Sequence, residues 1–339
     1  MVSQTVIAKH LNLSQRTVSL CLADSDRVAA ATKKRVLEAA EQLGYRRNQS
    51  ALAMRSGRFG SIGLLQCTQE QYSYLPPSIL GSIQSTLAKE KLNLMVSSFS
   101  PAELNEEDRL PGFLREAMVD GLIVNYTYGF TPRFAEMVER SHLPSVWMNV
   151  KRPYGCVYPD DVGAGRMLTE KLLKLGHKRI AYFCHRTYDE HFSVADRYQG
   201  YESAMSAAGC APEKRVLEGN VPWENVDAGL EFVRSFLQGA RRPTAVVTYE
   251  AFEAMRTILA ARDLGLRVPE DLSVVTFSDR ESAGLGYPIT TCHVPNAEMG
   301  RRAVEMLVAR VNDRTAALPQ AAIPFTHVTG STASKPPKN

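Results

Sequence analysis

Short apolar runs alternate with longer amphipathic stretches along most of the chain, from residue 61 onward. Near-continuous apolar strands that alternate with helices are typical of parallel sheets covered on both faces. Two such sets, before and after about residue 160, predict an α/β architecture with two doubly wound parallel sheets in two lobes. The predicted strands are 61–67, 92–98, 121–126, 144–150, 179–184, 244–249 and 272–278. The predicted helices between them include 78–90, 161–175, 194–208, 225–238 and 250–264.

The stretch from Ser3 to Leu22 has a different pattern, with two short helices and a tight connection near residues 12–14. Ser3 and Ser14 are the expected N-caps of these helices. Gln15 and Arg16 then open the second helix with polar side chains that point outward. The apolar residues with the spacing to pack on one another are Val6, Ile7, Leu11, Leu13, Val18 and Leu22. The pattern predicts a helix-turn-helix, whose second helix is placed to contact base edges of DNA.

A third helix is expected from about residue 30 to residue 43, ended by Gly44. Its expected apolar stripe is Val36, Leu37, Ala40 and Leu43. The following segment, 46–58, is rich in arginine and poor in large apolar residues, and is therefore predicted to be a linker. Residues 50–55 have the composition for one or two helical turns, which are marginal until DNA or a partner copy orders them.

Charge is distributed unevenly along the chain. The first 60 residues carry ten basic and four acidic residues, whereas the whole chain carries 40 and 36. The N-terminal region therefore has a net charge of +6 and the remainder −2. A basic region on a near-neutral body indicates binding to a polyanion. The alternative, a solvated basic surface, is disfavoured because the charge coincides with the helix-turn-helix pattern.

Several protein classes are disfavoured. No run of about 20 apolar residues and no basic-then-apolar leader is present, so a cytoplasmic protein is expected. The six cysteines are scattered without a C-x-x-C pair, as in reduced thiols. His185 and His191 have a spacing that suits no usual zinc site. No Ser-His-Asp set, P-loop or strand–G-x-G-x-x-G–helix arrangement occurs, so we expect no enzyme activity, metal or cofactor.

Two groups of short motifs follow one another along the chain. Each motif alone is weak evidence, but their order and spacing cover about residues 2–332. The motifs of the N-terminal region are V-I-A-K-H-L-N-L-S-Q-R-T-V-S and V-L-E-A-A-E-Q-L-G-Y-R-R-N. Those of the body are V-D-G-L-I, K-L-G-H-K-R-I-A, R-Y-Q-G-Y, G-L-R-V-P-E-D-L-S-V-V-T-F-S-D, P-I-T-T and M-G-R-R-A-V-E-M-L. In this order and spacing the motifs resemble those of the lactose-repressor/galactose-repressor (LacI/GalR) family of bacterial transcription regulators.

The resemblance implies a helix-turn-helix DNA-binding head, a hinge helix and a two-lobed body like a periplasmic sugar-binding protein. It also implies a homodimer that binds a near-palindromic double-stranded DNA operator, and a small-molecule effector bound between the lobes. The expected boundaries are 1–45 for the head, 46–59 for the hinge, 60–332 for the body and 333–339 for a disordered tail. The expected lobes are about 60–159 plus 293–319, and about 161–291 plus 322–332.

The resemblance also assigns DNA contacts. Gln15, Arg16 and Leu20 match base-reading positions, where Gln suits adenine and Arg suits guanine. Leu20 replaces an arginine common in the family, so a shifted operator sequence is expected. The remaining matches are Thr17, Ser19, Arg27 and Asn48 for phosphates, and Ala51 and Met54 for the minor groove of the hinge site. The alternatives are a solvated surface for Gln15 and Arg16, a local helix-start bond for Thr17, and packing on the body for Met54.

Effector contacts follow from the same resemblance, with Arg197 as the residue that usually holds the ligand. Ser278 stands where the family commonly has aspartate, and Tyr249 and Glu250 stand near an expected Asn-Asp pair. The pocket is therefore expected to depart from the usual monosaccharide site, to take an altered sugar or a glycoside, or to have lost ligand binding. For each residue the alternative is a strand-end packing role. The remaining expected pocket residues are Cys67, Tyr74, Asn125, Asn149 and Trp223, with Tyr72, Tyr126 and Tyr128 as further lining.

These features together predict a ligand-responsive, sequence-specific DNA-binding transcription regulator, expected to be a repressor that associates with the bacterial nucleoid. A solute-binding receptor of the same body fold is the first alternative, and the cytoplasmic start argues against it. An enzyme is disfavoured by the missing catalytic set. A nonspecific architectural DNA-binding protein remains a third alternative, which binding to palindromic and scrambled DNA distinguishes.

Overall fold

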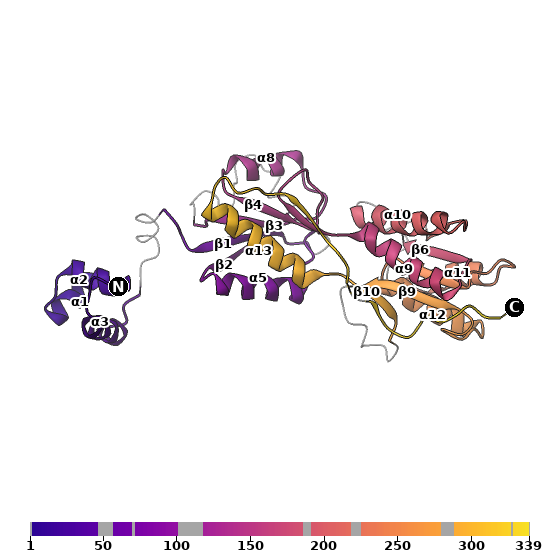
Figure 1. Cartoon of the computed structure of the whole chain (residues 1–339), viewed down its shortest axis with the longest axis horizontal. Helices are drawn as coiled ribbons and strands as arrows, with labels where there is room; N and C mark the ends of the chain where they lie inside the picture. Colours follow the sequence, from indigo (N-terminus) through magenta and orange to yellow (C-terminus); the bar gives the residue numbers. More distant parts are fainter. Residues whose placement is uncertain are drawn as a thin grey trace. The chain divides into compact units, whose positions relative to one another are not determined.

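The computed structural model describes residues 2–46, 57–69, 72–100, 118–185, 191–217, 225–278, 288–326 and 328–338. The chain divides into two compact units, Met1–Phe59 and Gly60–Asn339. The first unit contains the helical N-terminal region, which we call the head (residues 2–46). The second unit, the body, contains two six-stranded sheets, each in its own lobe (Figure 1). This arrangement confirms the predicted α/β class with an α-helical head.

The head consists of α1 (Gln4–Leu11), α2 (Gln15–Leu22) and α3 (Ala30–Gln42). Ile7, Val18 and Val36 each contribute a fully buried side chain, one from each helix. Asn12 ends α1 in the left-handed region at φ 53°, which turns the chain sharply into α2. Gly44 adopts φ 66° just after α3, as predicted for the residue that ends this helix. The head is therefore a three-helix unit around one small apolar core.

Two predictions for the head core were wrong, whereas the N-cap predicted at Ser3 is present. Ser3 is at the N-cap of α1, but its side chain caps no backbone N–H, whereas its carbonyl accepts bonds from Val6 and Ile7. Val6 is 44% exposed and Leu37 is 51% exposed, so neither belongs to the core. Leu37 lies outside the core because the buried face of α3 is formed by Val36, Ala39 and Ala40, so that Leu37 points away from it.

The N-terminus of α3 offers a test of the head's stability. Its N-cap is Ala29, an extended, exposed residue whose side chain forms no capping bond. We expect Ala29→Ser to stabilise the head by about 1 kcal/mol, because a serine hydroxyl can accept a bond from a free N–H of the first turn. Slower amide hydrogen exchange in α3 is the measurement. Ala30→Ser, one residue inside the helix, is the control, and equal protection in both variants would contradict the capping explanation.

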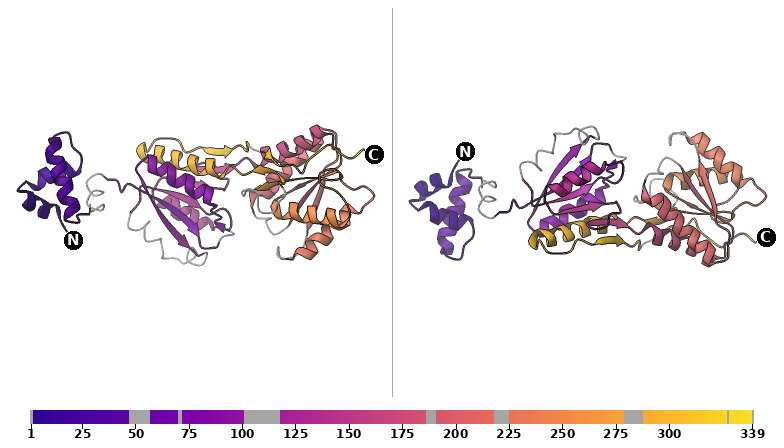
Figure 2. Two further views of the ribbon diagram at one scale, coloured as in Figure 1. Left: turned by 90° about the horizontal axis from the view of Figure 1, so that it is seen from below. Right: turned by 90° about the horizontal axis from the view of Figure 1, so that it is seen from above.

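The first lobe contains a parallel sheet in the order β11-β5-β4-β3-β1-β2. Helices α5 (Pro77–Lys89) and α13 (Asn296–Asn312) pack side by side on one face (Figures 1 and 2). Helix α8 (Pro132–Arg140) covers the other face. The strands are β1 (Ser61–Cys67), β2 (Asn93–Phe99), β3 (Gly121–Asn125), β4 (Ser145–Met148), β5 (Cys156–Pro159) and β11 (Gln320–Ile323).

The second lobe contains a sheet in the order β12-β10-β9-β8-β6-β7, parallel except for the antiparallel pair of β10 and β12. Helices α9 (Asp161–Leu175) and α10 (Phe192–Ala207) pack on one face, and α11 (Val226–Leu237) and α12 (Ala251–Asp263) on the other. The strands are β6 (Ile180–His185), β7 (Glu213–Leu217), β8 (Ala245–Thr248), β9 (Ser273–Ser278), β10 (Thr290–His293) and β12 (Val328–Thr329).

The chain passes between the lobes three times. It crosses between β5 and α9, between β10 and α13, and between β11 and β12.

The expected disordered tail from residue 333 is wrong at its start. Ser334 donates its N–H to the Ser273 hydroxyl at 3.1 Å, and its carbonyl lies 2.9 Å from Nε2 of buried His177. The segment after β12 is therefore fixed to the second lobe through at least Ser334.

Helices α9 and α10 touch through their backbones. A Cβ atom on Gly165 would lie 2.2 Å from the Arg197 carbonyl oxygen, and one on Gly200 would lie 2.1 Å from the Val162 carbonyl oxygen. Only residues without a side chain fit at these two positions. This contact brings the first turn of α9 against the middle of α10.

In the part of the chain that the structure describes, no helix is long and apolar enough to cross a membrane.

Candidate functional site

The second helix of the head presents a polar surface at its start. The Ser14 hydroxyl accepts the Thr17 N–H at 3.0 Å, which confirms Ser14 as the N-cap of α2. Gln15 and Arg16 follow immediately and are exposed, while Val18, Cys21 and Leu22 are buried in the head core. The fold thus anchors one face of α2 in the head core and leaves the two predicted base-reading side chains exposed on the other face.

The other expected DNA contacts differ in their surroundings. Leu20 and Ser19 are half-buried on α2, and Arg27 is exposed in the turn before α3. The Thr17 hydroxyl lies 2.8 Å from the Ser14 hydroxyl, so it takes part in the helix-start bonding that was its alternative role. Asn48, Ala51 and Met54 lie outside the described residues.

The second candidate site is centred on Arg197, at the carboxyl ends of the second-lobe strands. Its Nε donates to Asp161 Oδ1 at 2.6 Å, and its Nη1 donates to the Tyr249 carbonyl at 2.8 Å. The guanidinium also lies 4.7 Å from the ring centres of Tyr249 and Phe277. Arg197 is 8% exposed and Asp161 is fully buried. The arginine is therefore held rigidly by a carboxylate, a carbonyl and two aromatic faces.

Electrostatics favour a charged pair at this site. Burial alone would lower the pKa of Arg197, but the adjacent Asp161 carboxylate raises it above the ordinary arginine value. Burial raises the pKa of the Asp161 carboxyl, and the Arg197 guanidinium opposes that rise. Because arginine stays protonated in proteins, the 2.6 Å contact keeps Asp161 ionised. Among the described residues, Asp161 Oδ2 is buried without a hydrogen-bond partner and remains an acceptor.

A chain of hydroxyl contacts extends from this pair to the start of α10. The Tyr249 hydroxyl lies 2.8 Å from the Ser193 hydroxyl, which lies 2.7 Å from His191 Nδ1. The Ser193 N–H also donates to Nδ1, so we assign the histidine proton to Nε2. Burial, followed by the positive charge of Arg197, lowers the pKa of His191 to about 4. The imidazole is therefore a neutral group with one N–H donor at neutral pH.

His191 is expected to make the body sensitive to acid. Its pKa is about 4 in the folded protein and returns to 6.5 in the unfolded chain, so the unfolded chain binds the proton first. The free energy of unfolding should therefore be unaffected by His191 above pH 6.5 and fall by about 3 kcal/mol as the pH drops towards 4. Tryptophan fluorescence in urea reports the body, because both tryptophans, Trp147 and Trp223, lie there.

The comparison for this acid effect is His191→Asn, which keeps an N-cap oxygen for the Ser193 N–H but does not titrate. The difference in unfolding free energy between wild type and variant should change between pH 7 and pH 4.5. The same pH dependence in both proteins would contradict the role assigned to His191.

In the first lobe, Asn125 and Cys67 are placed at strand ends but are buried rather than open. The Asn125 side-chain amide donates to the carbonyls of Ser73 and Tyr74 at 3.3 and 3.4 Å. The Ser73 hydroxyl accepts the Cys67 N–H at 2.6 Å and donates to the Asn125 carbonyl. These bonds fix the loop that carries Tyr72 and Tyr74 onto the ends of β1 and β3.

Tyrosine rings gather beside this loop. The rings of Tyr72 and Tyr126 stack with centres 5.9 Å apart, and Tyr128 meets Tyr72 edge-on at 5.3 Å. Burial, together with a hydrogen bond to Cys67, raises the pKa of Tyr126 well above its usual range, so its hydroxyl stays protonated. Tyr128 also lies edge-on to His191 of the second lobe, with ring centres 5.9 Å apart. The tyrosines thus extend from the first-lobe loop to the start of α10.

Further contacts join the same two regions. Lys151 of the first lobe forms an ion pair with Asp196 of α10. The Lys151 ammonium also lies over the rings of Tyr158 and Phe192, at 5.6 and 5.3 Å from their centres. Lys151 and Arg197 are therefore each paired with a carboxylate, which α10 and α9 supply respectively.

The structure brings together only some of the predicted effector residues. Arg197 contacts Tyr249 and Asn125 contacts Tyr74, while Asn149, Glu250 and Ser278 are half-buried at or just after strand ends. Trp223 lies outside the described residues. Sequence reasoning did not assign Asp161, His191 or Ser193 to this site. The sequence did contain one signal for Asp161, which is the acid pair Asp160–Asp161 at the start of a predicted helix. Asp160 caps α9, and Asp161 is the next residue.

Comparisons with known proteins agree with this arrangement. Residues 7–48 match the model of the bacterial regulatory proteins of the lacI family, and residues 169–333 match the periplasmic binding protein-like domain. The HTH-type transcriptional regulator RegA of Clostridium saccharobutylicum is 31% identical over 314 residues, covering 91% of this chain and 92% of the relative. The HTH-type transcriptional regulator CelR of Thermobifida fusca is 27% identical over 320 residues, covering 91% and 92%.

Solved structures show the same fold. The lac repressor dimer bound to operator and the anti-inducer ONPF matches with a TM-score of 0.75 at 22% identity, covering 98% of this chain and 99% of that chain. The complex of the transcriptional regulator CelR with cellobiose matches with a TM-score of 0.63 at 24% identity, covering 98% and 100%. The likeness to RegA extends through both the head and the body, and this chain belongs to the lacI family of bacterial regulatory proteins.

Proposed function

We propose that this protein is a sequence-specific DNA-binding transcriptional repressor whose operator affinity is set by a small molecule bound between the lobes. The observation that carries the proposal is the capped recognition helix, in which Gln15 and Arg16 are exposed on a basic head. Glutamine and arginine side chains each form paired hydrogen bonds with one base edge in the major groove. The body, which matches the periplasmic binding protein-like domain, supplies the site at which a ligand acts.

The regulator acts as a homodimer in the cytoplasm, at the nucleoid. Two heads then read two half-sites of a near-palindromic operator, as the two-fold symmetry of a dimer requires. The structure of the lac repressor dimer bound to operator supports this assembly. Ligand shifts the population of lobe arrangements, and the hinge segments of 46–59 transmit the change to the heads.

The proposed effector is a sugar or a sugar-like metabolite, and the cellobiose complex of CelR supports that class. A glycoside fits better than a plain hexose, because Ser278 lacks the carboxylate that accepts sugar hydroxyl bonds, while tyrosine rings line the first-lobe loop. Calorimetry against a panel of hexoses, disaccharides and aryl glycosides tests this. Tight binding of a plain hexose that is lost on replacing Ser278 would overturn the glycoside assignment.

Sequence specificity distinguishes this proposal from a nonspecific architectural protein and from a solute-binding receptor. Gel shifts should show a complex with palindromic DNA that survives salt better than the complex with scrambled DNA, because nonspecific binding depends mainly on phosphate charge. Equal salt dependence for both duplexes would support the architectural alternative. A protein that binds neither duplex but binds a solute would support the receptor alternative.

Leu20 provides the sharpest test of the recognition helix. We expect Leu20→Arg to change the preferred half-site, because arginine can donate two hydrogen bonds to guanine where leucine offers only apolar contact. Selection of duplexes from a randomised pool by wild type and variant is the measurement. Leu37→Arg adds the same charge on exposed α3 and should leave the preference unchanged. An unchanged preference for Leu20→Arg would refute the placement of Leu20 at the bases.

A further inference from the structure

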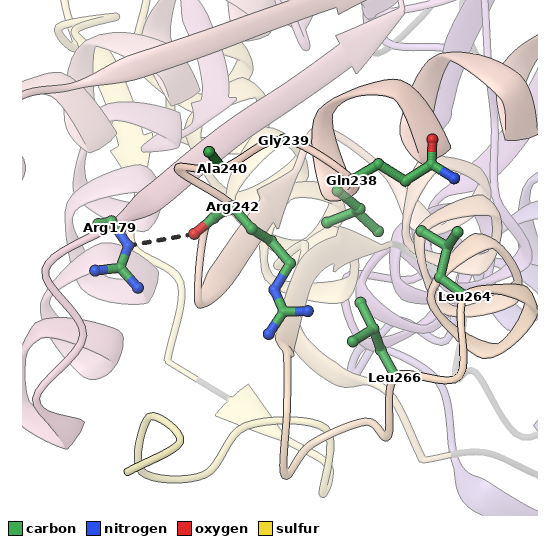
Figure 3. A pocket seen from close by; sticks show the side chains of 8 residues that line it. Arg179, Gln238, Gly239, Ala240, Arg242, Leu264 and Leu266 are labelled. Carbon is green, nitrogen blue, oxygen red and sulfur yellow. Dashed lines mark hydrogen bonds between the residues drawn. The ribbon is translucent and has the colours of Figure 1, made fainter. Parts of the chain in front are cut away.

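A surface pocket lies in the second lobe at the end of the sheet opposite the Arg197 site. Arg179 precedes β6 and Arg242 precedes β8, so the pocket is at the amino ends of these strands, whereas Tyr249 follows the carboxyl end of β8. Its volume is about 400 Å³, within the range of small-molecule sites. The lining residues are Arg179, Leu237, Gln238, Gly239, Ala240, Arg242, Leu264 and Leu266 (Figure 3).

The pocket has a positive charge without a matching acid in its lining. Figure 3 shows the Arg242 side chain between Arg179 and Leu266, and the Arg179 Nε donates to the Arg242 carbonyl at 3.2 Å. That bond holds the two arginines beside one another. Each also has a basic neighbour in sequence, Lys178 and Arg241, and no carboxylate lines the pocket.

Other arginines of the second lobe behave differently. Arg215 pairs with Glu213, Arg234 with Asp263, and Arg267 with Asp271. Of the residues that the structure describes, none forms an ion pair with Arg179 or Arg242. Asp271 is close enough to Arg242 to feel its charge, but both of its carboxylate oxygens accept bonds from Arg267, at 2.9 and 3.3 Å. The pocket therefore keeps two cationic groups whose charge the lobe itself leaves unbalanced.

We propose that this pocket binds a small molecule that carries a phosphate group. A guanidinium is planar, permanently charged and able to donate two parallel bonds to phosphate oxygens, and two of them meet at this pocket. The Gln238 side chain adds an amide, and Leu237, Leu264 and Leu266 supply apolar surface for the carbon skeleton of the ligand. The site is independent of Arg197 and of the effector proposed above, so either assignment can fail without the other.

Isothermal titration of the full chain with inorganic pyrophosphate tests the proposal. The variant is Arg179→Gln/Arg242→Gln, which removes both guanidiniums and keeps polar side chains of similar length. The control is Arg140→Gln/Arg215→Gln, which removes the same charge from exposed, paired arginines elsewhere in the body. Hydrogen exchange with and without pyrophosphate locates the contact, since the basic head is a second place where a polyanion can bind.

We expect saturable binding that the Arg179/Arg242 variant weakens at least tenfold and that the control leaves within twofold. Protection on binding should appear at residues 237–242 and 264–266. Absence of saturable binding to the wild-type chain would overturn the proposal. It would also be overturned by equal weakening in both variants, which indicates a general charge effect, or by protection confined to the head.

Discussion

Replacement of Gly200 by alanine is expected to lower the free energy of unfolding of the body by about 3 kcal/mol or more. The added Cβ would lie 2.1 Å from the Val162 carbonyl oxygen, 2.7 Å from the Arg166 nitrogen and 3.0 Å from the Gly165 Cα. All three atoms belong to the backbone of α9, so no side-chain rotation can relieve the clash. The two helices must separate, and burial between them and the sheet is lost.

The separation should also act on the Arg197 site. Asp161 is the first residue of α9 and Arg197 lies three residues before Gly200 on α10, so movement of the helices separates the ion pair. Urea unfolding followed by tryptophan fluorescence measures the loss of stability. Gly81→Ala is a matched control, because Gly81 is also helical but has open space around its Cβ position. We expect this control to be neutral or stabilising, and an equally mild effect at Gly200 would contradict the close packing.

Most of the body was predictable because local patterns encode it. Each predicted strand of the two sheets is present, with ends within two residues of those observed, and α9 matches its predicted range. The strands are apolar runs of four to eight residues, and such runs can be recognised without knowing which strands they pair with. The two-lobe division followed because strands and helices alternate on either side of residue 160.

The strands β5, β7, β10, β11 and β12 were missed, and β7 and β11 show how partners elsewhere in the sheet determine a strand. β7 carries the charged residues Glu213, Lys214 and Arg215, and becomes a strand because it extends the edge of the second sheet beside β6. β11 is four residues long and joins the first sheet beside β5, which lies some 160 residues earlier. Short edge strands of this kind contain little periodicity, and non-local pairing determines them.

In the candidate site, too, features set by local sequence were predicted and features set by distant contacts were missed. The exposure of Gln15 and Arg16 followed from the capping signal and the apolar spacing of a short helix. Asp161 was not found because its partner, Arg197, is 36 residues away and approaches only through the Gly165–Gly200 contact. Likewise, Asn125 was expected to line the pocket, yet its side-chain amide donates its hydrogen bonds to backbone carbonyls of the Tyr72–Tyr74 loop. Sequence pattern indicates which residues reach a strand end, but packing decides which atoms stay open.

The Asp161–Arg197 pair is the last feature whose removal should have a large effect. Asp161→Asn is expected to lower the free energy of unfolding of the body by about 3 to 5 kcal/mol. The pair is buried, and the substitution leaves the Arg197 guanidinium charged with no compensating carboxylate. Exposed pairs behave otherwise, so Glu136→Gln, which removes the partner of exposed Arg140, should cost less than about 1 kcal/mol.

A double replacement separates the charge effect from simple loss of packing. Asp161→Leu/Arg197→Met removes both charges and fills the site with apolar side chains, and should recover most of the stability lost in Asp161→Asn. Urea titration of the three variants and the wild type gives the comparison. Stability restored by the apolar pair, together with loss of effector response, would mean that the ion pair is retained for ligand binding rather than for folding. If the double replacement is as unstable as Asp161→Asn, the burial of an unpaired charge is not the cause, and the contact is required for the packing of α9 against α10.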